Sequence, residues 1–158
     1  MKILAIDPGY ERVGIAVIDK SDSGREVLLF SECFKTSAKL DFPDRLKLIG
    51  DEVDRVILEH NPELLAIEAL FFARNTTTAL SVAEAKGVIT VVAKNHGLDV
   101  MELKPNEIKV AVTGYGKATK HDIANMVPKL IDADLTGKID DEIDAIAIGL
   151  SASAIYRK

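Results

Sequence analysis

The sequence has almost no cysteine and no long hydrophobic run. Its 158 residues include one cysteine, Cys33, which excludes an internal disulfide and a cysteine-rich zinc site and is typical of proteins in the reducing cytoplasm. No apolar run is long enough to cross a bilayer, and Met1 and Lys2 lead straight into a predicted strand, so we expect neither a membrane segment nor a signal peptide. We therefore expect a cytoplasmic protein that folds as a single domain over residues 1–158.

Positive charge is also scarce overall. The formal net charge is −5, which taken alone argues against a nucleic-acid-binding protein. The charges are unevenly distributed, however, because residues 132–144 contain six acids and one basic residue, Lys138. Residues 104–121 contain one acid and four lysines, which are Lys104, Lys109, Lys117 and Lys120. Since salt screens distant charges, a local basic loop can bind a polyanion despite a negative total.

The hydrophobic pattern predicts an α/β fold with a five-stranded mixed sheet flanked by helices. Three apolar runs with short links predict an antiparallel meander, and a later run reached through a helix predicts a strand parallel to the first. The expected strands are residues 2–7, 12–19, 26–34, 64–67 and 98–103. The expected helices begin near Pro43, Asn75 or Thr76, Lys104, Thr119 and Asp140, and they end near Asn61, His96, Thr113, Ile131 and Tyr156.

Carboxylates occupy positions from which a folded sheet could bring them together. Asp7 closes the first predicted strand and Glu68 closes the fourth, so both lie at one edge of the sheet if those strands are parallel neighbours. Asp141 and Asp144 are three residues apart and share one face of the last predicted helix. An apolar stripe on the opposite face would be buried, and it comprises Ile143, Ile146, Ala147, Leu150 and Ala154.

Four carboxylates that converge on one point repel each other unless cations neutralise them. All-oxygen ligation suits Mg²⁺, with Mn²⁺ as a substitute, and does not suit zinc. Two such ions about 3.5–4 Å apart can activate a water molecule and stabilise an in-line displacement at phosphorus. The sequence therefore predicts a two-ion site with the ligands Asp7, Glu68, Asp141 and Asp144. In the alternative, the two aspartates of the last helix only cap and solvate it.

The predicted helix of residues 76–96 is apolar on nearly every side. Glu84 and Lys86 are the only charged residues between Ala79 and Ala93, and such a helix must be covered on more than one side. The sheet can cover one side and a second copy of the protein the other, which predicts a homodimer formed through this helix. The alternative is a central helix roofed by its own domain.

Five segments resemble the RuvC-type Holliday junction resolvases of bacteria, in the order and at the spacing of that family. They are IDPGYERVG (6–14), AIEALFFARNTTTAL (66–80), AKG (85–87), KPNEIKVAVTGYGKATK (104–120) and DEIDAIAIG (141–149). The resemblance spans nearly the whole chain and implies an RNase H-like fold and a homodimeric, Mg²⁺-dependent endonuclease of DNA recombination and repair. Such an enzyme nicks two opposing strands of a four-way DNA junction and works with a branch-migration helicase complex.

The resemblance also implies roles for individual residues. The family's four metal-binding acids match Asp7, Glu68, Asp141 and Asp144. Its DNA-contacting residues match Phe71, which would stack on an opened base, and the lysines Lys109 and Lys120. The choice of Asp141 depends on its spacing to Asp144, because the neighbouring Asp140 and Glu142 are acidic as well.

The residue types themselves agree with these roles. Two adjacent aromatics in a predicted loop, Phe71 and Phe72, are costly to expose unless they stack on a base, which contributes about 1–3 kcal/mol. The alternative for them is packing against the next helix. Lys117, like Lys109, can bind phosphate as a point charge, and Lys120 near a scissile phosphate can stabilise transition-state charge, although a solvated surface is the alternative. Arg74 is a weaker candidate for DNA binding.

Three other functions remain open at this point. A nuclease similar to the YqgF-like proteins would keep Asp7, Glu68 and the metal ions and act on ribosomal RNA precursors. The basic segment 104–120 and the pairing of Glu68 with Phe71 favour the junction resolvase over it. An actin-like ATPase needs a second glycine-rich phosphate loop, for which this chain is too short. A non-catalytic module would bind branched DNA and leave it uncut.

Overall fold

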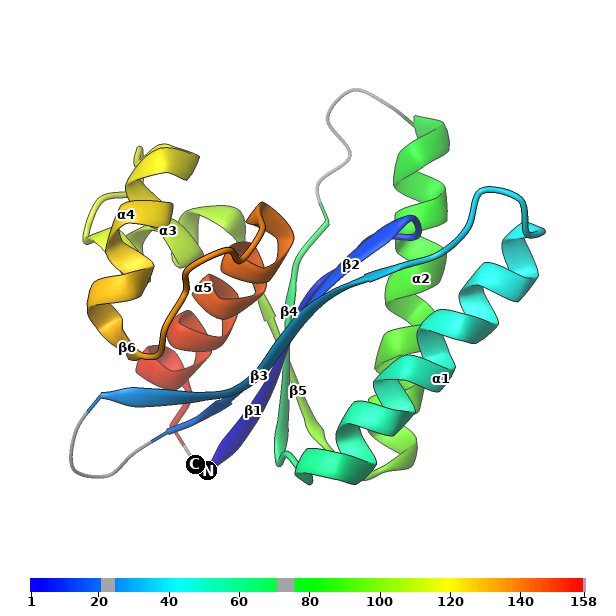
Figure 1. Cartoon of the computed structure of the whole chain (residues 1–158), viewed down its shortest axis with the longest axis horizontal. Helices are drawn as coiled ribbons and strands as arrows, with labels where there is room; N and C mark the ends of the chain where they lie inside the picture. Colours follow the sequence, from blue (N-terminus) through cyan, green and yellow to red (C-terminus); the bar gives the residue numbers. More distant parts are fainter. Residues whose placement is uncertain (21–24, 71–75, 158) are drawn as a thin grey trace.

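The computed structural model describes residues 1–20, 25–70 and 76–157, and it contains a mixed β-sheet with helices on both faces (Figure 1). The strands are β1 (Lys2–Asp7), β2 (Arg12–Asp19), β3 (Glu26–Lys35), β4 (Leu64–Glu68), β5 (Asp99–Leu103) and β6 (Ile131–Asp132). Their order across the sheet is β5-β4-β1-β2-β3-β6. The first three strands form the predicted antiparallel meander, and β4 and β5 continue the sheet in parallel beyond β1.

The sheet has one strand more than the five predicted. Ile131 and Asp132 form β6, which pairs in parallel with Glu26 and Val27 at the edge of β3. The hydrophobic pattern instead places Ile131 at the end of a helix and Asp132 in a polar link. A two-residue strand is too short to show an alternating pattern, so only its neighbour in space reveals it.

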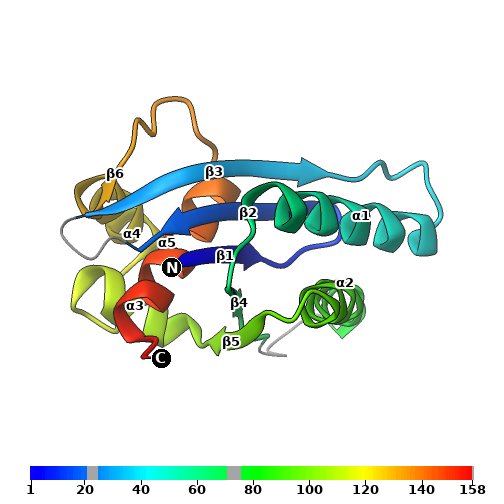
Figure 2. The ribbon, with the colours of Figure 1, turned by 90° about the horizontal axis from the view of Figure 1, so that it is seen from below.

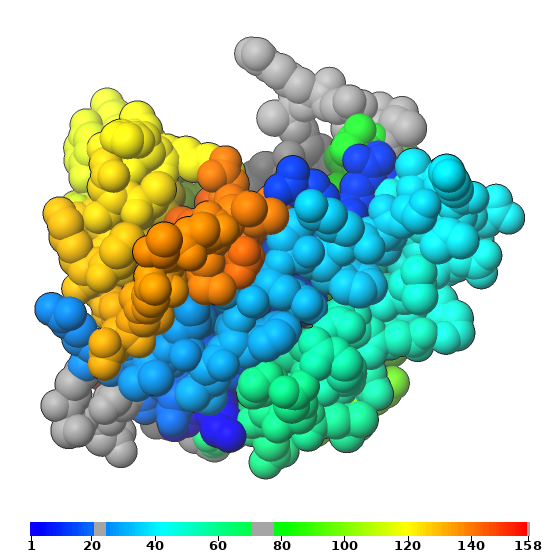
Figure 3. Space-filling view, in the orientation of Figure 1, coloured from blue at the N-terminus to red at the C-terminus, as the bar shows by residue number. Residues whose placement is uncertain are grey.

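The helices divide between the two faces of the sheet. They are α1 (Phe42–His60), α2 (Thr76–Asn95), α3 (Pro105–Thr113), α4 (Lys120–Leu130) and α5 (Asp140–Ile155). One hydrophobic cluster joins the sheet to α1 and α2, and another joins its opposite face to α3, α4 and α5. Figure 2 shows the same two groups of helices from below. In the space-filling view, the segment from α4 into α5 (yellow to orange) lies directly beside the surface of β3 (light blue; Figure 3).

The central strands are buried on both faces, as their uniform apolarity predicts. Residues 3–6 of β1 and 64–67 of β4 expose at most 1% of their surface. Side chains alternate between the two layers, so that Ile6 packs with α1 and α2 whereas Ala5 packs with α5. By the same alternation, Asp7 faces the α5 layer.

Local signals set several helix ends. Thr119 and Asp122 form the predicted capping box at the start of α4, where the backbone N–H of Asp122 donates to Thr119 Oγ1 over 3.2 Å. Asn61 ends α1 in the left-handed conformation, with φ of 51°. The helix α2 begins at Thr76, and Asn75, the other predicted cap, lies outside the described residues.

The helix that is buried on every side is α5. Residues 145–153 are all buried, because the sheet covers one side of α5 and α3 and α4 contact it as well. Gly149 permits the close approach, since a Cβ there would come within 2.6 Å of Ile18 Cδ1. The one-sided stripe predicted for this helix is therefore wrong in two respects: burial extends around the helix, and Ala154 at its end is exposed.

The outer side of α2 is uncovered by the described part of the chain. Leu80 and Val91 keep 60% and 59% of their surface exposed, and a Cβ added at Gly87 between them would meet no atom within 4 Å. A helix roofed on all sides by its own domain, the alternative considered above, does not hold for this side of α2. Within the described residues, no helix combines the length and apolarity needed to span a membrane.

Candidate active site

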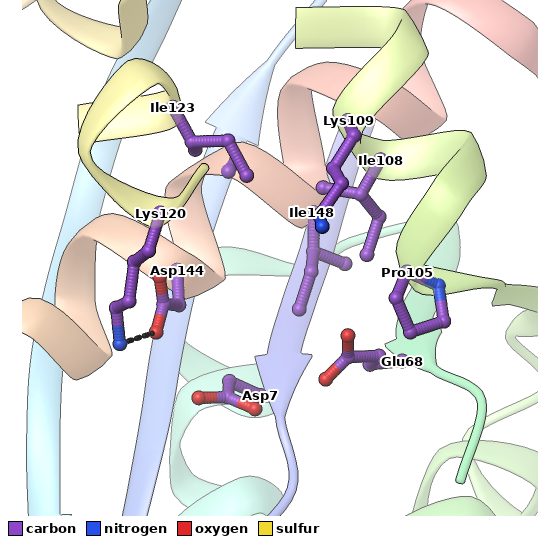
Figure 4. Close-up of a pocket in the computed structure, with 10 residues that line it drawn as sticks. Asp7, Glu68, Pro105, Ile108, Lys109, Lys120, Ile123, Asp144 and Ile148 are labelled. Atoms are coloured by element: carbon purple, nitrogen blue, oxygen red, sulfur yellow. Dashed lines mark ion pairs between the residues drawn. The ribbon is translucent and has the colours of Figure 1, made fainter. Parts of the chain in front are cut away.

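Asp7 and Glu68 lie side by side at the carboxyl ends of β1 and β4. The parallel register pairs Ile6 with Ile67, so the next residue of each strand is one of the two carboxylates. Both side chains line a pocket of about 240 Å³, which residues of α3, α4 and α5 close from the other side (Figure 4). Open α/β sheets bind their ligands beyond the carboxyl ends of adjacent parallel strands, and this pocket has that position.

The pocket combines charged groups with an apolar wall. Its charged side chains are Asp7, Glu68, Lys109, Lys120 and Asp144. Its other lining residues are Pro105, Ile108, Ile123, Ala147 and Ile148. Figure 4 shows the carboxylates of Asp7 and Glu68 together at one end, with the isoleucines beyond them. An apolar wall lowers the local dielectric and so strengthens every charge interaction inside the pocket.

Each carboxylate near the pocket makes ionisation of the others less favourable. The pKa of Asp7 is raised to about 7, first by burial and then by the charges of Glu68, Asp144 and Asp141, against the opposing charge of Lys120. Burial and the charge of Asp144 also raise the pKa of Glu68. Repulsion of this kind between buried carboxylates is relieved by a proton or by a cation bound among them.

The start of α5 carries the other two candidate ligands, and each is paired with a basic side chain. Lys120 Nζ lies 2.7 Å from Oδ2 of Asp144, and the guanidinium of Arg12 donates a hydrogen bond to Asp141. Asp144 lines the pocket, whereas Asp141 is not among the lining residues. Asp141 still belongs to the same electrostatic group, because its charge contributes to the raised pKa of Asp7.

The donor set fits a hard divalent cation. All four candidates offer carboxylate oxygens, the ligands that favour Mg²⁺ or Mn²⁺ over zinc. Burial first and then the neighbouring carboxylates raise the pKa of Asp7, and the nearby Lys120 does not offset them. Within the residues that the structure describes, no three His, Cys, Asp or Glu side chains form an assembled metal-binding group. Asp141 and Asp144 instead hold the cationic side chains of Arg12 and Lys120.

The acidic neighbours of Asp141 have partners of their own. Glu142 accepts hydrogen bonds from Ser31 (2.8 Å) and Lys138 (3.0 Å), which tie it to β3 and to the preceding loop. Asp140 is exposed, and its closest basic partner, Lys120, is 4.0 Å away. None of the three acids lines the pocket with Asp7 and Glu68, but Asp141 is the one of them whose charge contributes to the raised pKa of Asp7, so the choice of Asp141 stays a prediction.

The predicted DNA-contacting residues are placed differently. Lys109 on α3 and Lys120 at the start of α4 both line the pocket. Lys117 is exposed in the loop between these helices and does not line it. Three further candidates lie outside the described residues and stay predictions, and these are Phe71, Phe72 and Arg74.

Two residues of the site, Arg12 and Gly14, are missed by the sequence patterns considered above. Gly14 pairs with Asp7 across β1 and β2, and a Cβ added to it would lie 2.1 Å from the carbonyl oxygen of Asp141. A usable signal existed: both residues follow Asp7 on the returning strand of a hairpin, which has to lie beside the first strand.

Comparisons with other proteins agree with this arrangement. Residues 3–152 match the family described as crossover junction endodeoxyribonuclease RuvC. A protein of that name from Desulfitobacterium hafniense is 41% identical over 150 residues, which cover 95% of this chain and 90% of the relative. Another, from Halothermothrix orenii, is 38% identical over 157 residues, which cover 99% of this chain and 94% of the relative.

Solved structures lead to the same family. T. thermophilus RuvC in complex with a Holliday junction substrate has a TM-score of 0.91 at 30% identity, covering 98% of this chain and 93% of that one. A yeast mitochondrial Holliday junction resolvase has a TM-score of 0.74 at 12% identity, which shows a shared fold alone. The predicted α/β fold class is thereby confirmed. Because the family match and the relatives cover nearly the whole sequence, the chain belongs to the crossover junction endodeoxyribonuclease RuvC family.

Proposed function

We propose that this protein is a structure-specific, metal-dependent DNA endonuclease that resolves Holliday junctions in recombination and repair by nicking two opposing strands. Residues 1–158 would act as one nuclease domain. One observation carries the proposal: in a chain of the RuvC family, two carboxylates from adjacent parallel strands and one from α5 line the same pocket beside two lysines. Acids and cations so close together suit phosphodiester hydrolysis.

The cofactor in this proposal is Mg²⁺, which Mn²⁺ can replace, with two ions per active site. Asp7, Glu68, Asp141 and Asp144 would be the ligands. Burial and then the charges of the other three acids raise the pKa of Asp7, and this electrostatic coupling supports their shared role. When bound, the two ions would polarise a phosphate and activate a water for in-line displacement. The aspartates of α5 are at present ion-paired with Arg12 and Lys120 through Oδ2, so a metal ion would share these carboxylates with the two basic side chains or displace them.

Lys120 acts catalytically in this proposal. Its ammonium group lies 2.7 Å from Asp144 inside the pocket, so a small movement brings it to a phosphate held among the carboxylates. There it would stabilise the negative charge that develops in the transition state. Lys109 in the same pocket and Lys117 on the adjoining exposed loop would bind neighbouring phosphates.

Stacking completes the DNA contacts that we propose. Phe71 and Phe72 would stack on bases opened at the junction, and Arg74 would contact the backbone. These residues follow Glu68 closely in the sequence, so a base held there would keep the scissile phosphate near the carboxylates.

A homodimer formed through α2 supplies the second active site that paired nicking requires. The support for this assembly is the uncovered side of the helix, where Leu80 and Val91 are more than half exposed and Gly87 leaves room for an approaching chain. Apolar surface of this kind is stabilised when a partner removes it from water. We also propose a cytoplasmic location and a branch-migration helicase complex as the partner that delivers the junction.

A labelled synthetic four-way junction tests the function. Each strand is labelled in turn and incubated with the protein in Mg²⁺ or in EDTA, and products are separated on denaturing gels. We expect paired nicks at equivalent positions in two opposing strands, dependent on the divalent ion and absent from linear duplex. Cleavage of structured RNA in preference to the junction would favour the YqgF-like alternative. Tight junction binding without any nick would favour the non-catalytic module.

A further inference from the structure

Arg12 is the one basic residue of the site that comes from the hairpin following Asp7. It opens β2, and its guanidinium donates a hydrogen bond to Oδ2 of Asp141, 129 positions later in the chain. The Arg12 side chain is 51% exposed and the Asp141 side chain 22% exposed, so the pair lies at the mouth of the site, where solvent and ions reach it.

The sheet register fixes Arg12 on the face that carries the carboxylates. Asp7, Gly14 and Cys33 are paired in one row across β1, β2 and β3, and paired residues project to the same face. Arg12 precedes Gly14 by two residues on β2 and therefore projects to that face as well. Its contact with Asp141 is thus built into the strand pairing.

Two further neighbours flank the pair. The Cys33 side chain and then the charge of Asp141 raise the pKa of Arg12, whose guanidinium is charged at every physiological pH. The backbone of Gly14 is pressed against the carbonyl oxygen of Asp141, which sets the start of α5 beside β2. Asp141 therefore meets a permanent cation on one side and the sheet backbone on the other.

We propose that Arg12 is a positioning residue that occupies the Asp141 carboxylate in the metal-free protein, so that metal loading is an exchange of the guanidinium for the divalent ion. This inference rests on the proposed metal centre. A divalent ion that binds Asp141 comes close to the Arg12 guanidinium, and because the two positive charges repel each other they compete for the carboxylate. The competition lowers the apparent metal affinity. While no metal is bound, the Arg12–Asp141 pair keeps the start of α5 in place.

A second ion pair at the start of α5 offers a matched control. Lys138 lies 3.0 Å from Glu142, one residue after Asp141, and Glu142 is also tied to Ser31. Lys138→Gln removes the same unit of charge from beside the first turn of α5 as Arg12→Gln does. It leaves Asp141 and its partner untouched, so it isolates the general effect of charge from competition at the ligand.

The test is a calorimetric Mn²⁺ titration of the full chain and its variants, without DNA. We expect Arg12→Gln to bind Mn²⁺ about two- to fivefold more tightly than the unmodified protein, the range for a partly exposed ion pair. Arg12→Lys, which keeps the charge, should restore most of the original affinity, and Lys138→Gln should change it by less. In EDTA, Arg12→Gln should also have a lower melting temperature than the unmodified protein, and added Mn²⁺ should raise that temperature by more.

The outcomes separate the inference from the proposed function. If Asp7→Asn abolishes Mn²⁺ binding but Arg12→Gln leaves the affinity unchanged or weaker, the exchange is overturned and the proposed metal centre stands. An equal increase in Mn²⁺ affinity in Arg12→Gln and Lys138→Gln would mean that the effect is general electrostatics, and this result would also overturn the exchange. Failure of the unmodified protein to bind Mn²⁺, or equal binding by Asp7→Asn, would overturn the metal centre and the exchange together.

Discussion

Gly14 and Asp141 are in direct backbone contact, although 127 positions separate them in the sequence. A Cβ at Gly14 would lie 2.1 Å from the carbonyl oxygen of Asp141 and 3.3 Å from Cβ of Asp7. The glycine thus determines how closely the start of α5 approaches the strand that carries Asp7. The spacing between the strand carboxylate and the helix carboxylates depends on the absence of one methyl group.

Gly14→Ala should therefore destabilise the protein and disturb the site at the same time. Overpacking against a backbone oxygen should lower the free energy of unfolding by about 1–3 kcal/mol, as measured by urea denaturation, and reduce junction cleavage. Gly87→Ala is the control for stability alone, because its Cβ would meet no atom within 4 Å and alanine raises helix propensity, whereas cleavage is not compared there since Gly87 lies on the proposed dimer surface. Unchanged stability and cleavage in Gly14→Ala would contradict the contact.

Asp7→Asn should abolish cleavage and retain folding. The amide keeps the size of the side chain and removes the charge that is proposed to bind metal, so we expect the nicking rate to fall by at least about 100-fold. Junction affinity in a gel-shift assay should stay within about twofold. Asp51→Asn, which alters an exposed ion pair of α1 with Lys47, is the matched control. Nicking by Asp7→Asn at the original rate would remove Asp7 from the mechanism.

The raised pKa of Asp7 predicts a pH-dependent stability in the absence of metal. Its folded pKa is about 7 and its ordinary value is 3.8, so the stability associated with its proton is complete below pH 4 and is lost as the pH rises through 7. Asp7→Asn escapes this loss. In EDTA, its advantage in free energy of unfolding should grow by about 2 kcal/mol from pH 5 to pH 8. An advantage that is equal at both pH values would argue against the raised pKa.

If the dimer forms through α2, adding a single charged side chain to the uncovered side of this helix should convert the protein to a monomer. Val91→Glu places a carboxylate on the uncovered side of the helix, and burying that charge in an interface without a partner is strongly unfavourable. Sedimentation velocity should show a dimer for the unmodified protein and a folded monomer for Val91→Glu. Val110→Glu, at an exposed valine of α3 on the opposite face of the sheet, should stay dimeric. A dimer that survives Val91→Glu would place the interface elsewhere.

The sequence predicts most of the elements that position the site. The runs of β1 and β4 are short and apolar without interruption, as strands buried on both faces are, so the acids that end them stand out. Thr119 and Asp122 mark the start of α4, and with it Lys120, by local capping chemistry alone. Local sequence signals are therefore sufficient to place Asp7, Glu68 and Lys120 at the ends of their strands and helix.

Features that depend on packing between distant segments are not predictable in this way. Composition indicates that α2 and α5 are both apolar, yet only the fold determines that α3 and α4 contact α5 while the outer side of α2 is open. The pairing of Arg12 with Asp141 likewise needs the hairpin register and the docking of α5 together. Sequence patterns supply the candidate ligands, and the partners that hold them come from the tertiary structure.

The most direct test of the metal centre is a crystal structure of the protein soaked in Mn²⁺, with anomalous difference maps calculated near the manganese edge. We predict manganese between Asp7 and Glu68 and the α5 aspartates, with Asp141 released from Arg12 and Asp144 from Lys120. Peaks bound elsewhere, or none at a concentration that supports cleavage, with both ion pairs intact, would contradict the account.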